Sequence, residues 1–290
     1  ISSWKANAPG HTGKLAVEAI DRAMRGQKSP SPIYEGADSV VAAMLGGPDA
    51  EYRVPLPALE EPRRQILESY TKEHSAEYQA QALIDLAFKL RSRIEDFGAI
   101  DEIVIHTSRH THEVIGTGSN DPEKFDPSAS RETLDHSIMY IFAVALEDGV
   151  WHHEESYHPE RASRPETVRL WKKIRTTEEA EWTERYHASD PDRKAFGGHV
   201  EVRMQDGRVI EEEQAVADAH PNSEAAFRRG DYIEKFDRLT EEWIGRDERD
   251  RILGLVDRLP ELSVEEVRRL APEVDGNRLE AIRTDEGIFG

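Results

Sequence analysis

The residues with the clearest capacity for chemistry are His136 and Tyr140, which lie one helical turn apart in the stretch from Arg131 to Gly149. Successive residues turn by about 100° around an α-helix, so one side of this predicted helix is apolar and both ionisable side chains point away from it. The pair could transfer protons or orient a ligand. Two interpretations stay open: an ordinary exposed polar face, or a face covered by another part of the protein, as suggested by the apolar residues on it, Met139, Ala143 and Val144.

Lys5 and His220 are two further candidates for ligand binding. Lys5 precedes a predicted helix, Gly13 to Arg25, and sits beside small residues. A lysine near a helix start can bind a carboxylate together with backbone N–H groups, although a solvated terminal lysine is the ordinary alternative. His220 lies between a predicted hairpin and the helical C-terminal part, a junction of the kind that often houses ligand pockets. Its alternative is a histidine that only satisfies a loop.

The sequence does not predict a metal site. His106, His110 and His112 occur close together, but no carboxylate lies at a spacing that would complete a ligand set with them. The chain has no cysteine, which removes disulfides, thiolate nucleophiles and cysteine-held zinc or iron–sulfur centres from consideration. We therefore expect chemistry without a metal or another cofactor.

Composition limits the partners of the protein. The 290 residues carry a formal net charge of −20 and lack a basic run, which argues against nucleic acid and against anionic membranes as partners. An anionic ligand would therefore need a local cationic pocket. No apolar run reaches the roughly 18 residues of a membrane span and no signal peptide is present, so we expect a cytoplasmic location. The chain opens with Ile1 and is expected to begin inside a larger domain.

The pattern of elements predicts helical ends around an α+β middle. In the middle we expect a long helix from Ala76 to Phe97, a strand from Glu102 to Thr107 and another helix from Arg164 to Ile174. Asp206-Gly207 joins two alternating runs and predicts a β-hairpin. The C-terminal part is predicted to be helical at Tyr232 to Ile244, Glu248 to Asp257 and Val264 to Leu270.

Four separated blocks of this sequence together resemble the MmgE/PrpD family in order and spacing. They are Ser3-Trp4-Lys5, then Ser75-Ala76-Glu77-Tyr78-Gln79-Ala80-Gln81, then Arg131-Glu132-Thr133-Leu134-Asp135-His136-Ser137-Ile138-Met139-Tyr140, and Ala219-His220-Pro221 leading to Glu234-Lys235-Phe236. The resemblance implies a mainly α fold in which an α+β lid is inserted into a discontinuous all-helical domain, usually in a homodimer. The implied helical segments are residues 1–71 and 219–290, and the implied lid is 72–218. The N-terminal part of the helical domain is expected to be absent, and an isolated chain of this extent is expected to be inactive.

The reaction that the resemblance implies is the removal of water from 2-methylcitrate, a step of propionate breakdown, without an iron–sulfur centre. Citrate is a further expected substrate. Lys5 is implied to hold a substrate carboxylate, while His136 and Tyr140 orient the substrate or transfer protons. The implied substrate-binding residues are Gln79, Gln81, Arg131 and His220, although Ala219 replaces the glycine that precedes the histidine in relatives. The general base cannot be assigned from this sequence.

Two alternatives to dehydration remain. The first is decarboxylation of cis-aconitate, a reaction of the same family, and release of carbon dioxide would identify it. The second is an interaction or regulatory module, because site residues of the N-terminal part are expected to be missing. Loss of turnover on replacing Lys5 or His136 would separate catalysis from that second alternative.

Overall fold

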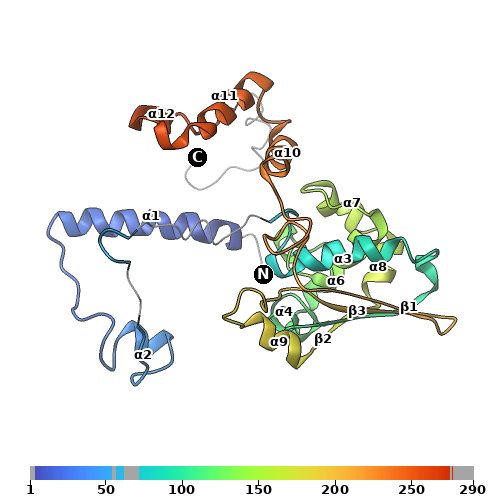
Figure 1. Ribbon diagram of the computed structural model, residues 1–290. Helices are drawn as coiled ribbons and strands as arrows, with labels where there is room; N and C mark the ends of the chain where they lie inside the picture. Colours follow the sequence, from blue (N-terminus) through green and yellow to red (C-terminus); the bar gives the residue numbers. More distant parts are fainter. Residues whose placement is uncertain (1–3, 54–56, 62–71, 275, 277–290) are drawn as a thin grey trace.

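The computed structural model describes residues 4–53, 57–61, 72–274 and 276, and it shows a four-stranded mixed sheet with helices packed on it and helical segments at both ends (Figure 1). Ser3 of the first sequence block therefore lies outside the described residues. The longer helices are α1 (Trp4–Met24), α3 (Gln81–Arg91), α6 (Ile138–Asp148), α10 (Arg229–Thr240) and α11 (Arg246–Asp257). The shorter ones are α2 (Val40–Met44), α4 (Arg109–Val114), α5 (Arg131–Leu134), α7 (Pro159–Ala162), α8 (Pro165–Trp171), α9 (Ala180–Tyr186) and α12 (Val264–Arg268).

The sheet has the strand order β2-β1-β3-β4, with β1 (Ile100–Thr107), β2 (Ile174–Glu178), β3 (Gly198–Met204) and β4 (Val209–Gln214). Strands β1 and β2 are parallel, and the other neighbours are antiparallel. The predicted strand β1 and the predicted hairpin are confirmed. Gly207 makes the hairpin turn with a φ of 86°, a left-handed conformation that favours glycine.

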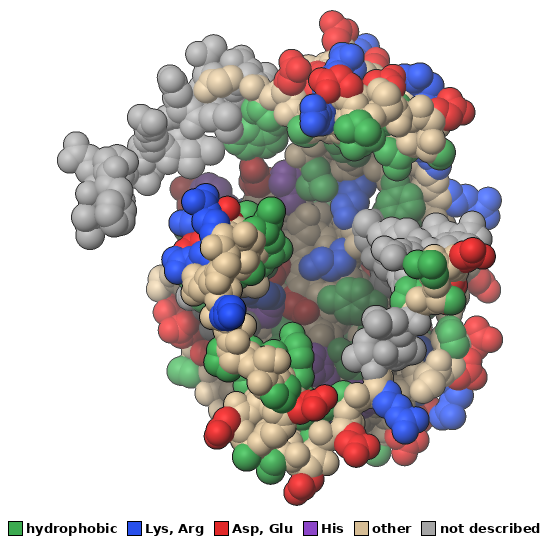
Figure 2. Space-filling view, turned by 90° about the vertical axis from the view of Figure 1, so that its left-hand side faces the viewer, with side chains coloured by type: hydrophobic (Ala, Val, Ile, Leu, Met, Phe, Trp, Pro, Cys, Tyr) green, Lys and Arg blue, Asp and Glu red, His purple; other side chains and the backbone are tan. Residues whose placement is uncertain are grey.

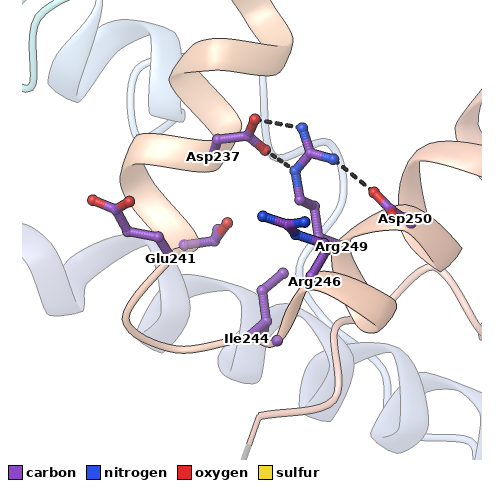
Figure 3. Close-up of a pocket in the computed structure, with 8 residues that line it drawn as sticks. Asp237, Glu241, Ile244, Arg246, Arg249 and Asp250 are labelled. Carbon is purple, nitrogen blue, oxygen red and sulfur yellow. Dashed lines mark hydrogen bonds and ion pairs between the residues drawn. The ribbon is translucent and has the colours of Figure 1, made fainter.

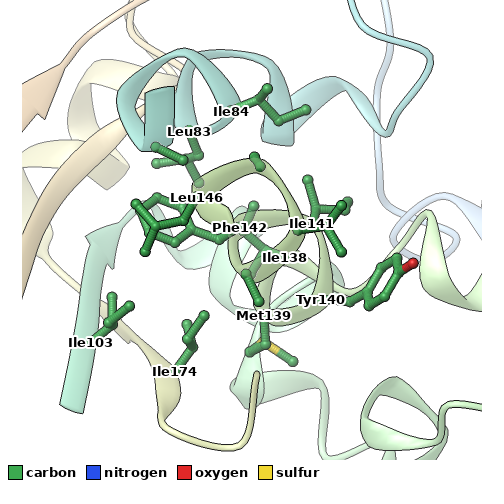
Figure 4. Packing of buried hydrophobic residues seen from close by; sticks show 14 of the residues in the cluster. Leu83, Ile84, Ile103, Ile138, Met139, Tyr140, Ile141, Phe142, Leu146 and Ile174 are labelled. Atoms are coloured by element: carbon green, nitrogen blue, oxygen red, sulfur yellow. The ribbon is translucent and has the colours of Figure 1, made fainter. Parts of the chain in front are cut away.

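The core lies between one face of the sheet and helices α3, α6 and α8 (Figure 4). Every residue from Ile138 to Leu146 is buried, so α6 is surrounded by apolar neighbours on all sides, as expected of a helix that is apolar all round. Leu83 on α3 and Ile103 on β1 pack around it. The covered interpretation of the α6 face is thus the correct one, and the exposed one is wrong.

The single helix predicted from Arg131 to Gly149 is in fact two helices, α5 and α6. Ser137 accepts a hydrogen bond from Tyr140 N at 3.2 Å and so caps the start of α6. The Ile138 N–H donates to Ile115 O at 2.9 Å instead of to the preceding turn. His136 therefore lies in the connection between two helices, and the helical period does not relate it to Tyr140.

Other element boundaries also differ from the prediction. The helix expected from Ala76 to Phe97 begins as a short 3₁₀ turn, because the Glu77 carboxylate caps that turn separately. Helix α3 follows it and ends at Arg91. The helix expected to reach Ile174 ends at Trp171, and Ile174 opens β2, a strand that was not predicted. Helix α1 begins at Trp4 and includes Pro9, so Lys5 lies in its first turn instead of ahead of it.

The N-terminal and C-terminal segments are helical, as predicted, and stand apart from the core (Figure 1). No residue of α1 is buried, and only its beginning lies near the α+β part of the chain. No described helix combines the length and apolar character that crossing a bilayer demands.

Candidate functional site

Lys5, Arg131 and residues just before α3 surround one pocket of about 290 Å³. Its lining residues are Lys5, Ala6, Lys72, Ser75, Ala76, Arg131, Glu132 and Asp135. Figure 2 shows a hollowed side of the molecule, and Lys, Arg and His side chains lie in the depression together with acidic and hydrophobic ones. The pocket unites three chain segments that are far apart in the sequence, as a binding site at a junction requires.

His136 lies against this pocket in direct contact with Lys5. Its side chain is only 3% exposed, and its Nε2 is hydrogen-bonded with Lys5 Nζ. Its Nδ1 lies 3.0 Å from Glu132 O and 3.2 Å from Asp135 Oδ2. Two acceptors around Nδ1 assign the ring proton to that nitrogen, so Nε2 carries the lone pair that faces the lysine. The imidazole is thus oriented to accept a proton at Nε2.

Asp135 has a second hydrogen-bond partner besides His136, the buried hydroxyl of Tyr157. The Tyr157 oxygen lies 2.7 Å from Asp135 Oδ1 and 2.7 Å from Ser75 O, two acceptors that share its one proton. Burial raises the pKa of Tyr157 well above its ordinary value, and the charge of Asp135 adds to this rise, so the phenol keeps its proton. Burial also works to raise the pKa of Asp135, but hydrogen bonds from His136 and Tyr157 outweigh it and hold that pKa below its usual value.

Replacing Asp135 by asparagine tests this network through its pH dependence. The pKa of Asp135 is lower in the folded protein than its ordinary 3.8, so its stabilisation is fully present above pH 3.8 and is lost as the pH falls through the lower folded pKa. We expect Asp135→Asn to be less stable than the parent in urea at neutral pH, with the difference shrinking in acid. Asp101→Asn, at an exposed position of β1, is the matched control. A difference that stays constant with pH would contradict this assignment.

Basic side chains concentrate around the pocket although the chain is strongly acidic overall. Arg131 stacks over the Tyr157 ring, with Cζ 4.7 Å from the centroid, and donates to His153 O at 2.8 Å. Lys235 of α10 donates to Lys72 O, and its pKa is lowered by burial and by the charge of Lys72. Three basic side chains, Lys5, Lys72 and Arg131, therefore line the pocket together with the acidic Glu132 and Asp135.

Gln81 and Gln79 lie on the first turns leading into α3. The Gln81 amide accepts from His74 N at 2.9 Å and donates to carbonyls of the same loop, including His74 O at 3.0 Å, so it holds the chain before α3 in place. Gln79 is best oriented with its side-chain oxygen 3.1 Å from His110 Nε2 and its nitrogen on the Glu77 carboxylate. Among the described residues, neither glutamine lines the pocket of Lys5.

Tyr140 is fully buried in the core, where its ring lies 4.9 Å from that of Trp171 and its hydroxyl donates to Ser156 O. Burial raises the pKa of this phenol well above its ordinary value. Among the described residues, Tyr140 does not line the pocket of Lys5, whereas His136 contacts Lys5 directly. A direct role in proton transfer stays a prediction, whereas its contacts favour support of the wall behind the pocket.

Replacing Tyr140 by phenylalanine is expected to cost stability of about 1–2 kcal/mol, because Ser156 O would be left buried without its donor. Urea denaturation measures the loss. Tyr34→Phe is the matched control, since Tyr34 is 68% exposed. A variant with parental stability would show that the hydroxyl does not support the core.

His220 lies where the chain leaves β4 and turns toward α10. Its Nδ1 accepts from Asn222 N at 3.1 Å, and its ring lies 6.5 Å from that of Phe196. Burial lowers the pKa of this imidazole, which keeps it neutral over a wider pH range. Phe196 belongs to a group of packed rings with Tyr78 and Tyr186, and in the described part of the chain His220 does not line the pocket of Lys5.

Sequence reasoning missed Lys72 and Asp135, which line the pocket, and Tyr157, which holds Asp135 in place. Asp135 stood inside the Asp-His-Ser block, and its position next to His136 was an available signal. Lys72 and Tyr157 carry no such signal, because only the fold brings Lys72 to the pocket and Tyr157 to Asp135.

A larger hollow, of about 570 Å³, lies between α10 and α11 (Figure 3). Arg249 pairs with Asp237 and lies 2.6 Å from Asp250 Oδ1. The hydrogen bond from Arg249 lowers the pKa of Asp237 below its usual value. These charges satisfy one another across the two helices, so the arrangement favours a structural contact over a reactive site.

Comparisons with known proteins match most of this chain to one domain type. Residues 74–261 match the MmgE/PrpD C-terminal domain. Over 141 residues the chain is 29% identical to a mitochondrial 2-methylcitrate dehydratase of Yarrowia lipolytica (strain CLIB 122 / E 150), an alignment that covers 47% of this chain and 25% of that protein. This chain thus spans about a quarter of the length of that relative. The matched domain contains every candidate residue except Lys5: Gln79, Gln81, Arg131, His136, Tyr140 and His220.

Proposed function

Since this chain belongs to the MmgE/PrpD family, we propose that it forms part of a dehydratase that removes water from 2-methylcitrate, with citrate as a further substrate. The observation that carries the proposal is the pocket in which Lys5, Lys72 and Arg131 meet beside His136. A tricarboxylate brings three negative charges, and cationic donors are the groups that bind it. The likeness to a 2-methylcitrate dehydratase supports this choice of ligand.

The geometry suggests how these residues act on such a substrate. Dehydration needs a base to take the proton beside a carboxylate and an acid to protonate the departing hydroxyl, while a carbon–carbon double bond forms. Lys5 would stabilise the negative charge that grows on the carboxylate as the proton leaves. His136, with its lone pair at Nε2, would accept or return a proton, and Asp135 would hold its ring in place. Arg131 would bind a second carboxylate.

The other candidate residues have supporting roles in this proposal. Gln81 fixes the loop that carries Ser75 and Ala76 to the pocket wall, and Tyr140 supports the core behind it. Gln79 and His220 would contact the substrate only when the lid, residues 72–218, closes against the helical segments 1–71 and 219–290. We propose these segments as parts of one discontinuous helical domain, in a homodimer.

Turnover tests the proposed function directly. The intact protein incubated with 2-methylcitrate is expected to produce a conjugated tricarboxylate, followed as a rise in ultraviolet absorbance and identified by mass spectrometry. Absence of product from both 2-methylcitrate and citrate would overturn the proposal. Release of carbon dioxide from cis-aconitate, without hydration or dehydration, would replace it by decarboxylation.

A further inference from the structure

We propose that His106, His199 and Glu201 form a site for a divalent transition-metal cation such as Zn²⁺ on the face of the sheet opposite the core. His106 on β1 pairs directly with His199 on β3 in the strand register, and Glu201 lies two residues further along β3. One ligand atom from each of the three residues lies within 4.8 Å of the others. Two histidines and one carboxylate are a usual protein ligand set for zinc, with a fourth position open to water.

The position of His106 favours a ligand over an ordinary surface histidine. Its Nε2 is shielded from solvent and makes no hydrogen bond within the described residues. Glu201 Oε1 lies 3.3 Å from this nitrogen, within ion-pair distance but outside hydrogen-bonding geometry. A buried nitrogen without a hydrogen bond normally costs stability, and a bound cation would satisfy it. The His106 and His199 rings are stacked with their centroids 5.4 Å apart, and one ring nitrogen of each lies within 4.8 Å of the other.

Glu201 is oriented by its neighbours as a metal ligand should be. Its Oε2 accepts from Arg203 Nη2 at 2.7 Å, which leaves Oε1 directed at His106. Arg203 is in turn held by Glu102, at 2.7 Å from Nη1. Such outer partners fix the orientation of ligands and tune their affinity.

The surrounding charge also favours a cation. Glu211 and Glu213 on β4 lie directly opposite Glu201 and His199 in the register, and paired residues of antiparallel strands share a face of the sheet. Two arginines lie nearby: Arg203 pairs with Glu201 and Glu102, and Arg175 of β2 also pairs with Glu102, at 2.5 Å. The three ligands are separate from the residues that line the pocket of Lys5, so the site is independent of the proposed dehydration.

A second cluster, Glu73, His74 and Asp85, also has metal-ligating groups close together, but its hydrogen bonds are already made. His74 Nε2 lies 2.7 Å from Asp85 Oδ1, and Asp85 Oδ2 accepts from Asp218 N at 2.8 Å. These bonds join the loop before α3 to the chain after β4. We therefore assign the cation to the sheet.

Titration of the metal-free intact protein with Co²⁺ tests the site, because cobalt in a four-coordinate zinc site gives strong visible absorption. We expect one Co²⁺ per chain, displaced by one Zn²⁺. His199→Ala should weaken binding by at least about tenfold, the lower limit usual when groups that only orient a ligand are changed. His158→Ala, at an exposed position, is the matched control and should bind like the parent.

Glu201→Gln gives an independent test with almost unchanged side-chain volume, and circular dichroism of the metal-free variants checks that they fold. It should also weaken Co²⁺ binding by at least about tenfold, since the amide lacks the carboxylate charge. Failure of the parent to bind either metal at millimolar concentration would overturn the proposal. Parental affinity in Glu201→Gln and His199→Ala would do the same and would direct attention to the Glu73 cluster.

Discussion

Replacing Lys5 by methionine in the full-length protein is expected to lower kcat/KM for 2-methylcitrate by about a hundred- to a thousandfold. Methionine keeps most of the length of the side chain and removes only the charged group that contacts His136 Nε2. Loss of one donor that stabilises charge in the transition state typically costs this much. Because Lys5 lies on a helix without buried residues, the variant should fold like the parent.

Lys14→Met is the matched control, because Lys14 lies on the same exposed helix and does not line the pocket. It should keep parental turnover. Separate values of kcat and KM show how Lys5 acts. If Lys5 bound only the ground state of the substrate, its replacement would raise KM and leave kcat unchanged. Parental turnover in Lys5→Met would contradict the catalytic assignment and favour the interaction-module alternative.

The sequence predicts those elements of the fold for which the local residue pattern and the packing in the fold favour the same structure. Asp206-Gly207 gave the hairpin because a left-handed turn residue stood between two alternating runs. β1 followed from a run of β-branched residues. By contrast, β2 was missed because Arg175, Thr176 and Thr177 carry no apolar alternation, and this strand forms only through its parallel pairing with β1.

The candidate site was predictable only in part. Residue type and position make Lys5 and His136 candidates, the family resemblance implies their roles, and the structure brings them into contact. The pairing of His136 with Tyr140 assumed one continuous helix, and the Ser137 cap broke that assumption. Likewise, the histidines next to His106 in the sequence are His110 and His112, whereas the fold places it beside His199 and Glu201 of β3. Pairings across a sheet cannot be read from spacing in a single sequence.

Replacing Arg161 by methionine is the second change with a large expected effect, here on stability. Helix α6 ends with Glu147 and Asp148, two negative charges at the negative end of the helix dipole. Arg161 is only 5% exposed and donates to both, with Nη2 2.8 Å from Glu147 Oε2 and Nε 2.8 Å from Asp148 Oδ2. Its removal leaves partly buried carboxylates without a counter-charge. Such changes typically cost about 3–5 kcal/mol, which urea denaturation would measure.

Two further variants show whether the loss of stability in Arg161→Met comes from the unpaired charge or from lost packing. Arg208→Met removes an arginine from an exposed pair with Asp206 and should cost less than about 1 kcal/mol. Adding Glu147→Gln to Arg161→Met should recover part of the loss, because an uncharged amide is cheaper to bury without a partner than a carboxylate. If the double variant were no more stable than Arg161→Met, the penalty would arise from packing around Thr167 instead of from charge. Helix α6 is the helix around which the core packs. Recovery of stability would therefore show that the core depends on neutralising the charges at the end of this helix.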